Sequence, residues 1–573
     1  MEDEATAATG APGKIALALF SLSLSALLVV SLTNTAVTQR LFVNTTYYFM
    51  LAAVLCWAGT YLHAARDLSF ARIARWAGEH YPGILTAFVV ATVAALAVEP
   101  ALRVLSDEAN LVGVSKNLFT SKTATFTVSG KNYYGSYWDV DVAIDRRPTL
   151  FPFLVSLLHA ALGYSHQNAF ICNLLLLAGL VFVAYRIAKS LGGETFGVIS
   201  ALLVAAHPIT LLSARSAGFD LLAVFFGLLV LKSLLDFCRD PSPARLAISW
   251  MNLCLFAEVR YETALFVPLV VLLLLLFRLI GWKMLRPYAF VYVLTPVYLM
   301  PRIWQALLRG NVPEQDPGTV TFSVDNFLDN VSEYFAPLLS PSEAVAHSVL
   351  LIAVGLVGAA MWMRWLLARV RARDLRSAET RFGIVVAAWM LLQAVIVFSY
   401  VWGRAQYPSS ARLLIAIDTF FSFAAAWVVT RTFTRFRPFV PVVLAVAVFV
   451  IHVPAAAQRR MMNRLTQTRE NAATWRFFER LGEERILIVT DRPNHFTIMN
   501  YGAMDFESAR RDPYLFTALA RRLFQDVYVI QQIELSTGKP LPKYSIWPDR
   551  NLTTVFEFQN DANVLVRISR LSH

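Results

Sequence analysis

Long apolar runs separated by short polar connections dominate the chain. About thirteen of these runs approach the ~20 residues that a membrane-spanning helix needs. They cover residues 15–32, 47–63, 84–104, 170–188, 196–212, 220–235, 246–259, 264–280, 288–304, 348–367, 384–401, 413–429 and 439–453. Several adjoin without a proper loop. The pattern predicts an α-helical polytopic membrane protein with about thirteen transmembrane helices.

Composition supports this class of protein. The chain is 57% hydrophobic and 16% charged, and its mean hydropathy is +0.53, which is too apolar for a soluble enzyme. The first run follows an acidic leader, MEDEATAATGAPGK. A signal peptide has a basic region before its apolar segment and a small-residue cleavage site after it. We therefore expect this run to be a retained span.

The net charge of +12 is distributed as a topology signal. Arginine and lysine collect in alternate connections, most densely at 364–381 and 431–437. Such connections face the cytoplasm in membrane proteins. The amino terminus is then cytoplasmic, and the connection that follows the third run lies outside together with the carboxyl-terminal tail. The basic balance gives no reason to expect a nucleic-acid partner.

Two outer segments are too long to be simple connections, so four parts are expected. These are amino-terminal transmembrane helices (1–105), an outer loop with surface helices (106–163), a transmembrane core (164–457) and an extracytoplasmic domain (458–573). In the last part, ERILIVT, QDVYVIQQIEL, TTVFEFQ and NVLVRIS read as strands, with a helical pattern over 506–524. This composition predicts a small α/β domain.

The outer loop begins with two carboxylates, Asp107 and Glu108, directly after an apolar run. Leu111, Val112 and Leu118 then recur at helical spacing with Lys116 on the other face, which predicts a helix on the membrane surface. Acids in a first helical turn interact favourably with the helix dipole. These two residues are therefore either helix-start stabilisers or part of a site.

Arginines at outer positions oppose the positive-inside bias and so need another explanation. Charges at a membrane edge are functional candidates because they are costly to place there. Mutual neutralisation is the alternative, with Arg215 paired to Asp220 and Arg260 to Glu262. The outer arginines are Arg40, Arg215, Arg260, Arg302, Arg309, Arg404 and Arg412.

Five short motifs in order along the chain resemble the GT-C membrane glycosyltransferases. They are VLSDE at the end of a span, RRPTLF, LLSARSAGFD, FAEVRYETALF and YPSSARLL. More narrowly, the chain resembles the branch that holds protein O-mannosyltransferases and the lipid A aminoarabinose transferase. That branch commonly has Glu-Lys-Pro-Pro-Leu where this chain has RRPTLF. Arg147 thus replaces the lysine, and Arg146 stands at the glutamate.

The resemblance implies an inverting transferase that moves a sugar from a polyprenyl phosphate to a lipid, protein or glycan acceptor. In this scheme Asp107 is the base, and Glu108 positions the acceptor or holds a cation. The departing phosphate contacts cationic side chains, because guanidinium binds phosphate oxygens through two hydrogen bonds. The implied donor-phosphate residues are Arg147, Arg215, Arg260 and Arg412.

The remaining expected roles concern a metal and the sugar. Asp220 either orients one of the arginines or shares a divalent cation, magnesium or manganese, with Asp107. Tyr134 and Trp138 either stack on a sugar ring or anchor the loop at the membrane interface. Glu262 is a further expected acceptor or sugar contact.

The resemblance also implies a bacterial inner (plasma) membrane protein whose site faces the periplasm. Two other functions remain open. One is a transporter or flippase of a lipid-linked saccharide, and the other is a scaffold with the same fold and no chemistry. The sequence does not identify the donor sugar or the acceptor.

Overall fold

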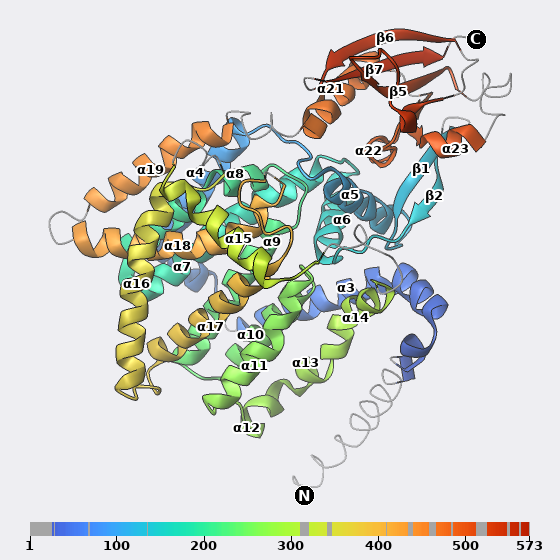
Figure 1. Cartoon of the computed structure of the whole chain (residues 1–573). Helices are drawn as coiled ribbons and strands as arrows, with labels where there is room; N and C mark the ends of the chain where they lie inside the picture. The colour runs from blue at the N-terminus through green and yellow to red at the C-terminus, as the bar shows by residue number, and fades with distance from the viewer. Residues whose placement is uncertain are drawn as a thin grey trace, which may run out of the picture.

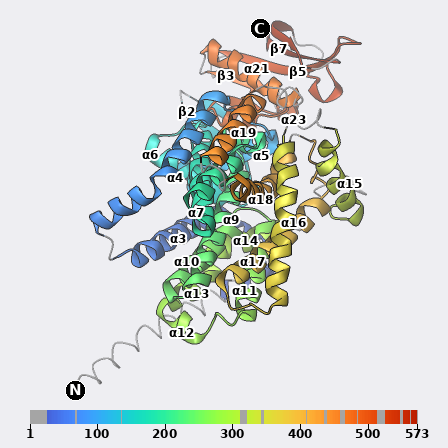
Figure 2. The same ribbon diagram turned by 90° about the vertical axis from the view of Figure 1, so that its left-hand side faces the viewer.

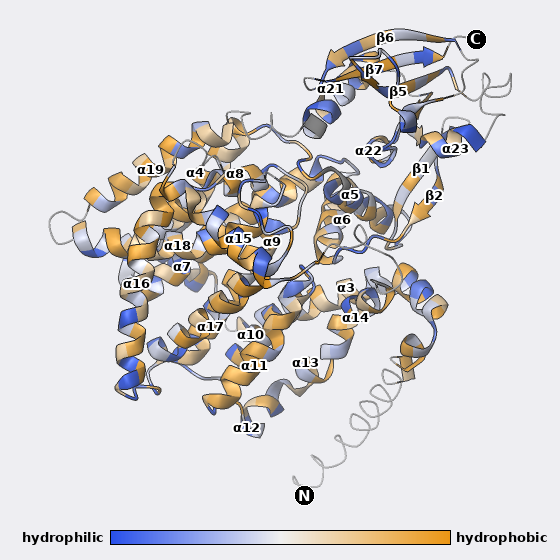
Figure 3. Ribbon diagram, viewed as in Figure 1, coloured by the Kyte–Doolittle hydropathy of each residue, from blue (hydrophilic) through white to orange (hydrophobic). Residues whose placement is uncertain are grey.

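The structure is a computed structural model. It describes residues 26–27, 29–66, 69–133, 136–309, 320–340, 346–407, 409–433, 439–457, 466–482, 485–511, 524–546, 551–560 and 563–571. A bundle of apolar helices carries a β-sheet at one end (Figures 1 and 2). Apolar residues dominate the bundle, whereas α21 (Thr466–Leu481) and α23 (Phe506–Arg511) are largely hydrophilic (Figure 3).

Within the described residues, eight helical segments are long and apolar enough to cross a membrane. We conclude that this is an integral membrane protein. The segments are α3 (Thr35–Ala64), α4 (Phe70–Ala97), α7 (Asn168–Ala205), α9 (Asp220–Arg239), α16 (Val349–Arg371), α17 (Ala378–Ser399), Ala411–Phe433, which comprises η5 (Ala411–Leu414) and α18 (Ile415–Phe433), and α19 (Val440–Ala457).

The other expected spans take different forms. Residues 170–188 and most of 196–212 belong to α7, which is kinked at Gly192 and Gly193. Shorter helices form at the runs expected at 246–259, 264–280 and 288–304. They are α10 (Pro243–Ala257), η1 (Glu262–Leu265) with α11 (Phe266–Leu276), and α13 (Ala289–Val293) with α14 (Thr295–Arg309). Most of the run at 15–32 lies outside the described residues.

Several helices begin where an N-cap side chain accepts a hydrogen bond from a backbone amide that would otherwise be unpaired. Ser348 accepts the amide of Leu351 at the start of α16, and Ser377 does the same for Thr380 at the start of α17. Helices α16 and α18 approach closely at Gly358, where a Cβ atom would lie 2.2 Å from the Ala424 carbonyl oxygen. This packing fixes α18, whose first turn follows one of the site arginines.

Within the described part of the chain, the sheet has seven strands in the order β2-β1-β4-β3-β5-β7-β6. The central strands β4 (Gly502–Met504), β3 (Ile486–Val489) and β5 (Asp526–Glu534) are parallel. Strands β7 (Val564–Leu571) and β6 (Leu552–Gln559) extend one edge in antiparallel pairing. All four strands expected in the tail are present. Of the helix expected at 506–524, α23 forms the start, and most of the rest lies outside the described residues.

The other edge of the sheet comes from the outer loop. Strands β1 (Phe126–Tyr133) and β2 (Ser136–Ala143) form a hairpin, and Gly130 of β1 pairs with Ala503 of β4. The sequence predicted that the tail forms a small α/β domain by itself. The tail instead shares its sheet with the outer loop. The loop and the tail, far apart in sequence, build one sheet.

Helix α5 (Leu105–Thr120) is the predicted helix after the acidic pair, but its polar face is covered by protein. Lys116 is 5% exposed. Its Nζ donates to the Thr497 carbonyl oxygen at 2.7 Å and lies 3.8 Å from the Tyr137 ring centroid. Strand β1 and α22 (Asn494–Thr497) pack over this face, which the prediction of a surface helix did not include.

Candidate functional site

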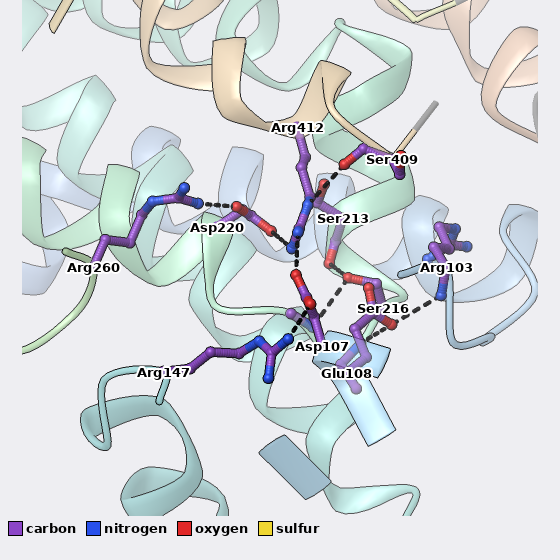
Figure 4. A network of polar contacts seen from close by, with 12 residues as sticks. Arg103, Asp107, Glu108, Arg147, Ser213, Ser216, Asp220, Arg260, Ser409 and Arg412 are labelled. Carbon is purple, nitrogen blue, oxygen red and sulfur yellow. Dashed lines mark hydrogen bonds and ion pairs between the residues drawn. The ribbon is translucent and has the colours of Figure 1, made fainter. Parts of the chain in front are cut away.

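Five chain segments bring charged side chains together (Figure 4). Asp107 lies in the first turn of α5, and Arg147 precedes α6 (Leu150–Leu162). Asp220 is the first residue of α9, where the helix dipole favours a carboxylate. Arg260 lies between α10 and η1, and Arg412 lies in η5. All five were expected site residues.

The five side chains form an alternating chain of charges. The Arg412 guanidinium joins two carboxylates, with Nη2 2.5 Å from Asp107 Oδ2 and Nη1 3.0 Å from Asp220 Oδ2. Arg147 pairs with the second oxygen of Asp107, and Arg260 pairs with the second oxygen of Asp220. The order is thus Arg147, Asp107, Arg412, Asp220, Arg260.

Two further acids close the ends of this charge chain. Asp145 accepts a hydrogen bond from Arg147 Nη1 at 2.6 Å, and Glu262 pairs with Arg260. The neutralising Arg260–Glu262 pair that the sequence suggested is therefore present. Three guanidinium groups face four carboxylates, so an anionic ligand would have to share or displace existing ion pairs.

Asp107 combines partial exposure with two cationic partners. Its side chain is 22% exposed, so a molecule from solvent can approach it. Burial raises the pKa of Asp107, but the charges and hydrogen bonds of Arg412 and Arg147 outweigh this effect and leave the pKa below its usual range. The carboxylate is therefore ionised at neutral pH.

Glu108 is buried, unlike its neighbour. It is 1% exposed, and its Oε2 accepts the backbone amides of Arg103 (2.9 Å) and Ala217 (3.1 Å). Burial raises its pKa to about 7 despite these hydrogen bonds. Glu108 therefore ties the start of α5 to the segment before α9.

Gly218 marks where Glu108 approaches the charge chain. A Cβ atom at this position would lie 3.0 Å from Asp220 Oδ2, 3.5 Å from Glu108 Oε1 and 3.7 Å from Arg412 Nη1. A side chain here would crowd the Asp220 carboxylate and contact the other two groups, so glycine leaves room for Asp220.

The other expected site residues lie elsewhere. Arg215 ends α8 (Pro208–Ala214), and its Nε donates to the Val98 carbonyl oxygen at 3.0 Å. Within the described part of the chain, no ion pair links it to Asp220. Trp138 lies on the edge strand β2 and is 60% exposed, apart from the charge chain. Tyr134 lies outside the described residues.

A supporting layer behind Arg147 was missed by the sequence analysis. Gln305 donates to the Arg147 carbonyl oxygen, and the Tyr261 hydroxyl donates to that of Arg146 at 2.8 Å. Arg302 in turn donates to the Tyr261 carbonyl oxygen at 3.0 Å. Arg302 stood among the outer arginines, but no sequence signal indicated that Gln305 holds the RRP segment.

A cavity of about 450 Å³ opens from the charge chain into the bundle. Asp220, Arg260, Glu262 and Arg412 line it at one end, and Glu379 and Arg431 at the other. Since α18 rises about 1.5 Å per residue, the two ends are roughly 28 Å apart. Between them the lining is mainly apolar and includes Trp362, Trp365, Phe382, Trp389, Phe420 and Trp427.

A divalent cation was expected between Asp107 and Asp220, but an arginine side chain lies there instead. The guanidinium of Arg412 already joins one oxygen of each carboxylate. These residues, as arranged, therefore do not form a cation site.

Comparison with known proteins gives one family match. Residues 146–304 match the family model described as dolichyl-phosphate-mannose-protein mannosyltransferase. This segment contains Arg147, Asp220 and Arg260 but neither Asp107 nor Arg412. No curated protein sequence matches the chain.

Solved structures resemble nearly the whole chain. ArnT from Cupriavidus metallidurans, in a crystal structure bound to undecaprenyl phosphate, is 14% identical with a TM-score of 0.52, and the match covers 86% of this chain and 98% of that chain. Its apo crystal structure is 14% identical with a TM-score of 0.52, covering 85% and 97%. The oligosaccharyltransferase of Archaeoglobus fulgidus, in complex with Zn and sulfate, is 12% identical with a TM-score of 0.43, covering 73% and 62%. The resemblance indicated by the sequence motifs is confirmed.

Proposed function

Because the chain resembles the GT-C membrane glycosyltransferases in fold and over residues 146–304, we propose that it is an inverting glycosyltransferase. The donor is a sugar carried on a polyprenyl phosphate. The acceptor is a hydroxyl or amine of a lipid, protein or glycan.

The observation that carries this proposal is the junction between the charge chain and the apolar cavity. Arg260 and Arg412 belong to both. A ligand that fills both regions has an anionic head and a long apolar tail, because guanidinium groups bind phosphate and an apolar lining favours hydrocarbon. A lipid-linked phosphate has this chemistry. The related ArnT structure was solved with undecaprenyl phosphate, which agrees with it.

In the proposed reaction Asp107 accepts the proton of the acceptor hydroxyl or amine. The acceptor atom forms a bond to the anomeric carbon, and the bond from that carbon to the phosphate oxygen breaks. The electron pair leaves with the lipid phosphate. A single displacement needs one base and inverts the anomeric centre. Asp107 suits this role because it is ionised and partly exposed to solvent.

The arginines stabilise the departing phosphate in this proposal. Fixed cations lower the barrier when they face charge that develops in the transition state. Arg147, Arg260 and Arg412 are the candidates at the charge chain, and Asp220 orients Arg260 and Arg412 through its two oxygens. Arg215 does not belong to the charge chain and donates instead to the Val98 carbonyl oxygen.

Glu108 acts mainly by position in this proposal. Its carboxyl group holds two backbone amides and keeps the base at the start of α5 in place. Glu262 orients Arg260. Trp138 and Tyr134 remain candidates for sugar or interfacial contacts in the loop above the site.

We further propose that the site faces the periplasm of a bacterial inner membrane, with up to about thirteen spans. The alternation of basic connections supports this orientation. It places the sheet, which lies above the charge chain, on the side where an acceptor arrives.

Asp107→Asn tests the function directly. The purified protein is given a radiolabelled sugar on polyprenyl phosphate together with membrane extract as the acceptor source. A transferase loses turnover in Asp107→Asn yet still binds the donor lipid. A flippase would move the donor lipid across the membrane of proteoliposomes equally well in the wild type and in Asp107→Asn. A scaffold would show the same result for both proteins in the transfer assay and in the proteoliposome assay. Either outcome would overturn the proposal.

A further inference from the structure

A second polar cluster lies inside the bundle, apart from the charge chain. It contains His207, at the start of α8, His347, just before α16, and Asp418 of α18. All three are buried, with 0%, 8% and 0% exposure. One ligand atom from each lies within 4.8 Å of the other two. Residues from three distant parts of the chain thus aim nitrogen and oxygen atoms at one point.

Hydrogen bonds fix the state of His207. Ser422 gives its hydroxyl proton to the Leu203 carbonyl oxygen at 3.1 Å, so its oxygen accepts from His207 Nε2 at 3.1 Å. The amide of Ser348 donates to His207 Nδ1 at 3.2 Å. The ring is therefore neutral, and its Nδ1 lone pair faces the Ser348 amide, which a metal ion bound at Nδ1 would displace. His207 Nδ1 lies 3.8 Å from Asp418 Oδ2.

Asp418 is held by partners that leave its charge unbalanced. The Tyr334 hydroxyl donates to Oδ1 at 2.7 Å, and His347 Nδ1 donates to Oδ2 at 2.6 Å. A neutral His347 leaves a buried carboxylate without a balancing charge. A protonated His347 instead places a charged N–H in the interior, because its Nε2 is buried and finds no acceptor among the described residues. Either state is costly in a dry environment.

We propose that His207, His347 and Asp418 bind a zinc ion. Two imidazole nitrogens and a carboxylate oxygen form a ligand set that zinc prefers, whereas magnesium and calcium prefer oxygen ligands alone. Zinc holds such atoms at about 2.0–2.2 Å, which places neighbouring ligands roughly 3.3 Å apart. The present separations of 2.6 and 3.8 Å from Asp418 Oδ2 lie on either side of this value.

The ion balances the charge of Asp418 and replaces the proton between it and His347. The surrounding groups already orient the ligands, as metal sites require. Ser422 fixes the tautomer of His207, and Tyr334 of α15 (Val324–Phe335) holds the carboxylate. The site joins α8, α15, α16 and α18. Because Asp418 follows Arg412 by six residues on the same segment, the ion also steadies the start of α18.

Metal content tests this proposal independently of any transferase activity. The full-length protein is purified with a tag that lacks histidine, and zinc is measured by mass spectrometry. We expect about one zinc ion per chain in the wild type and at least a fivefold lower content in His347→Ala and Asp418→Asn. His159→Ala is the matched control, because His159 is another buried histidine, bonded to Ser115 and Asn168. It should retain the ion.

A second measurement avoids dependence on the folding of the variants. Bound metal is removed from the wild-type protein with a chelator, and the protein is then titrated with Co²⁺. Cobalt should give the visible absorption bands typical of sites with a low coordination number, and Zn²⁺ should abolish these bands. Stripping should lower the melting temperature, and Zn²⁺ should restore it. The proposal is overturned if the wild type holds no zinc and does not respond to either ion. It is also overturned if His347→Ala and Asp418→Asn keep the wild-type zinc content.

Discussion

Lengthening one side chain by a single carbon gives the sharpest test of the proposed base. Asp107→Glu keeps the negative charge and the favourable position in the first turn of α5. It moves the carboxylate by about 1.5 Å, the length of one carbon–carbon bond. The helix cannot retreat to compensate, because Glu108 ties its start to the amide of Ala217.

The expected loss follows from this geometry. Both oxygens of Asp107 are engaged, one by Arg147 and one by Arg412. A longer side chain must push into these guanidinium groups or turn away from them, and either change misplaces the base. Misplacement by about 1 Å costs on the order of a hundredfold in rate, which equals about 2.7 kcal/mol in the barrier. We expect kcat to fall by about that factor.

The assay follows transfer from a defined polyprenyl-phosphate sugar by the purified enzyme, with donor binding and thermal stability measured in parallel. Thermal stability should change little, and donor binding should fall by a smaller factor than kcat, because the displaced carboxylate also disturbs Arg147 and Arg412. Asp141→Glu, the same substitution on the exposed strand β2, is the matched control and should keep full activity. If Asp107→Glu also kept full activity, Asp107 would be a helix-start stabiliser and the assignment of the base would be wrong.

Three further outcomes are expected. Arg147→Ala should weaken donor binding strongly, whereas Arg147→Lys should retain part of it, since lysine stands at this position in the related motif; equal binding in all three proteins, or equal loss in both variants, would mean that RRP only starts a helix. Glu108→Gln should change the pH dependence of thermal stability in detergent. The pKa of Glu108 in the folded protein is raised to about 7. Below pH 4.5 the carboxyl group is protonated in both the folded and the unfolded state, so the wild type has its full stability; as the pH rises to about 7, the wild type loses up to about 3 kcal/mol of stability relative to the variant. A difference in stability that does not change with pH would contradict the burial argument. Protease added to sealed, right-side-out vesicles should cleave the tail beyond residue 458, and complete protection would refute the proposed orientation.

Local patterns and the family resemblance together identified the charge chain. Asp107, Asp220, Arg260 and Arg412 each stand beside an apolar run, where a charge is conspicuous, whereas Arg147 was found through the resemblance of RRPTLF to the family motif. The structure brings all five together. Arg215 looked similar in sequence, but it follows α8 and donates to the Val98 carbonyl oxygen. The sequence did not reveal this, because hydropathy does not show in which direction a short helix runs.

Contacts between distant segments account for most of what the sequence did not reveal. The helical spacing placed Lys116 on the polar face of its helix, but it did not indicate that Thr497 and Tyr137 cover that face. Periodicity separates the two faces of a helix but does not say what packs against each. Alternation likewise predicted four strands in the tail, but not that the strand containing Gly130 would join them. Apolar runs alone also do not show where a helix kinks or stops, as in α7, which holds most of two expected spans around its kink at Gly192 and Gly193.

The shared sheet has a consequence for how the protein is made. Gly130 pairs with Ala503, so a ribosome adding roughly 5–20 residues per second needs tens of seconds to supply the partner of the loop hairpin. During that interval Lys116 lacks the backbone acceptor at Thr497 that later holds it. Glu108 ties the start of this segment to Arg103 and Ala217 earlier, but the polar face of α5 is covered only after the intervening helices have entered the membrane and the tail has reached the same side. Maturation is therefore tied to completion of synthesis, and nascent chains should be inactive until their last domain has been delivered.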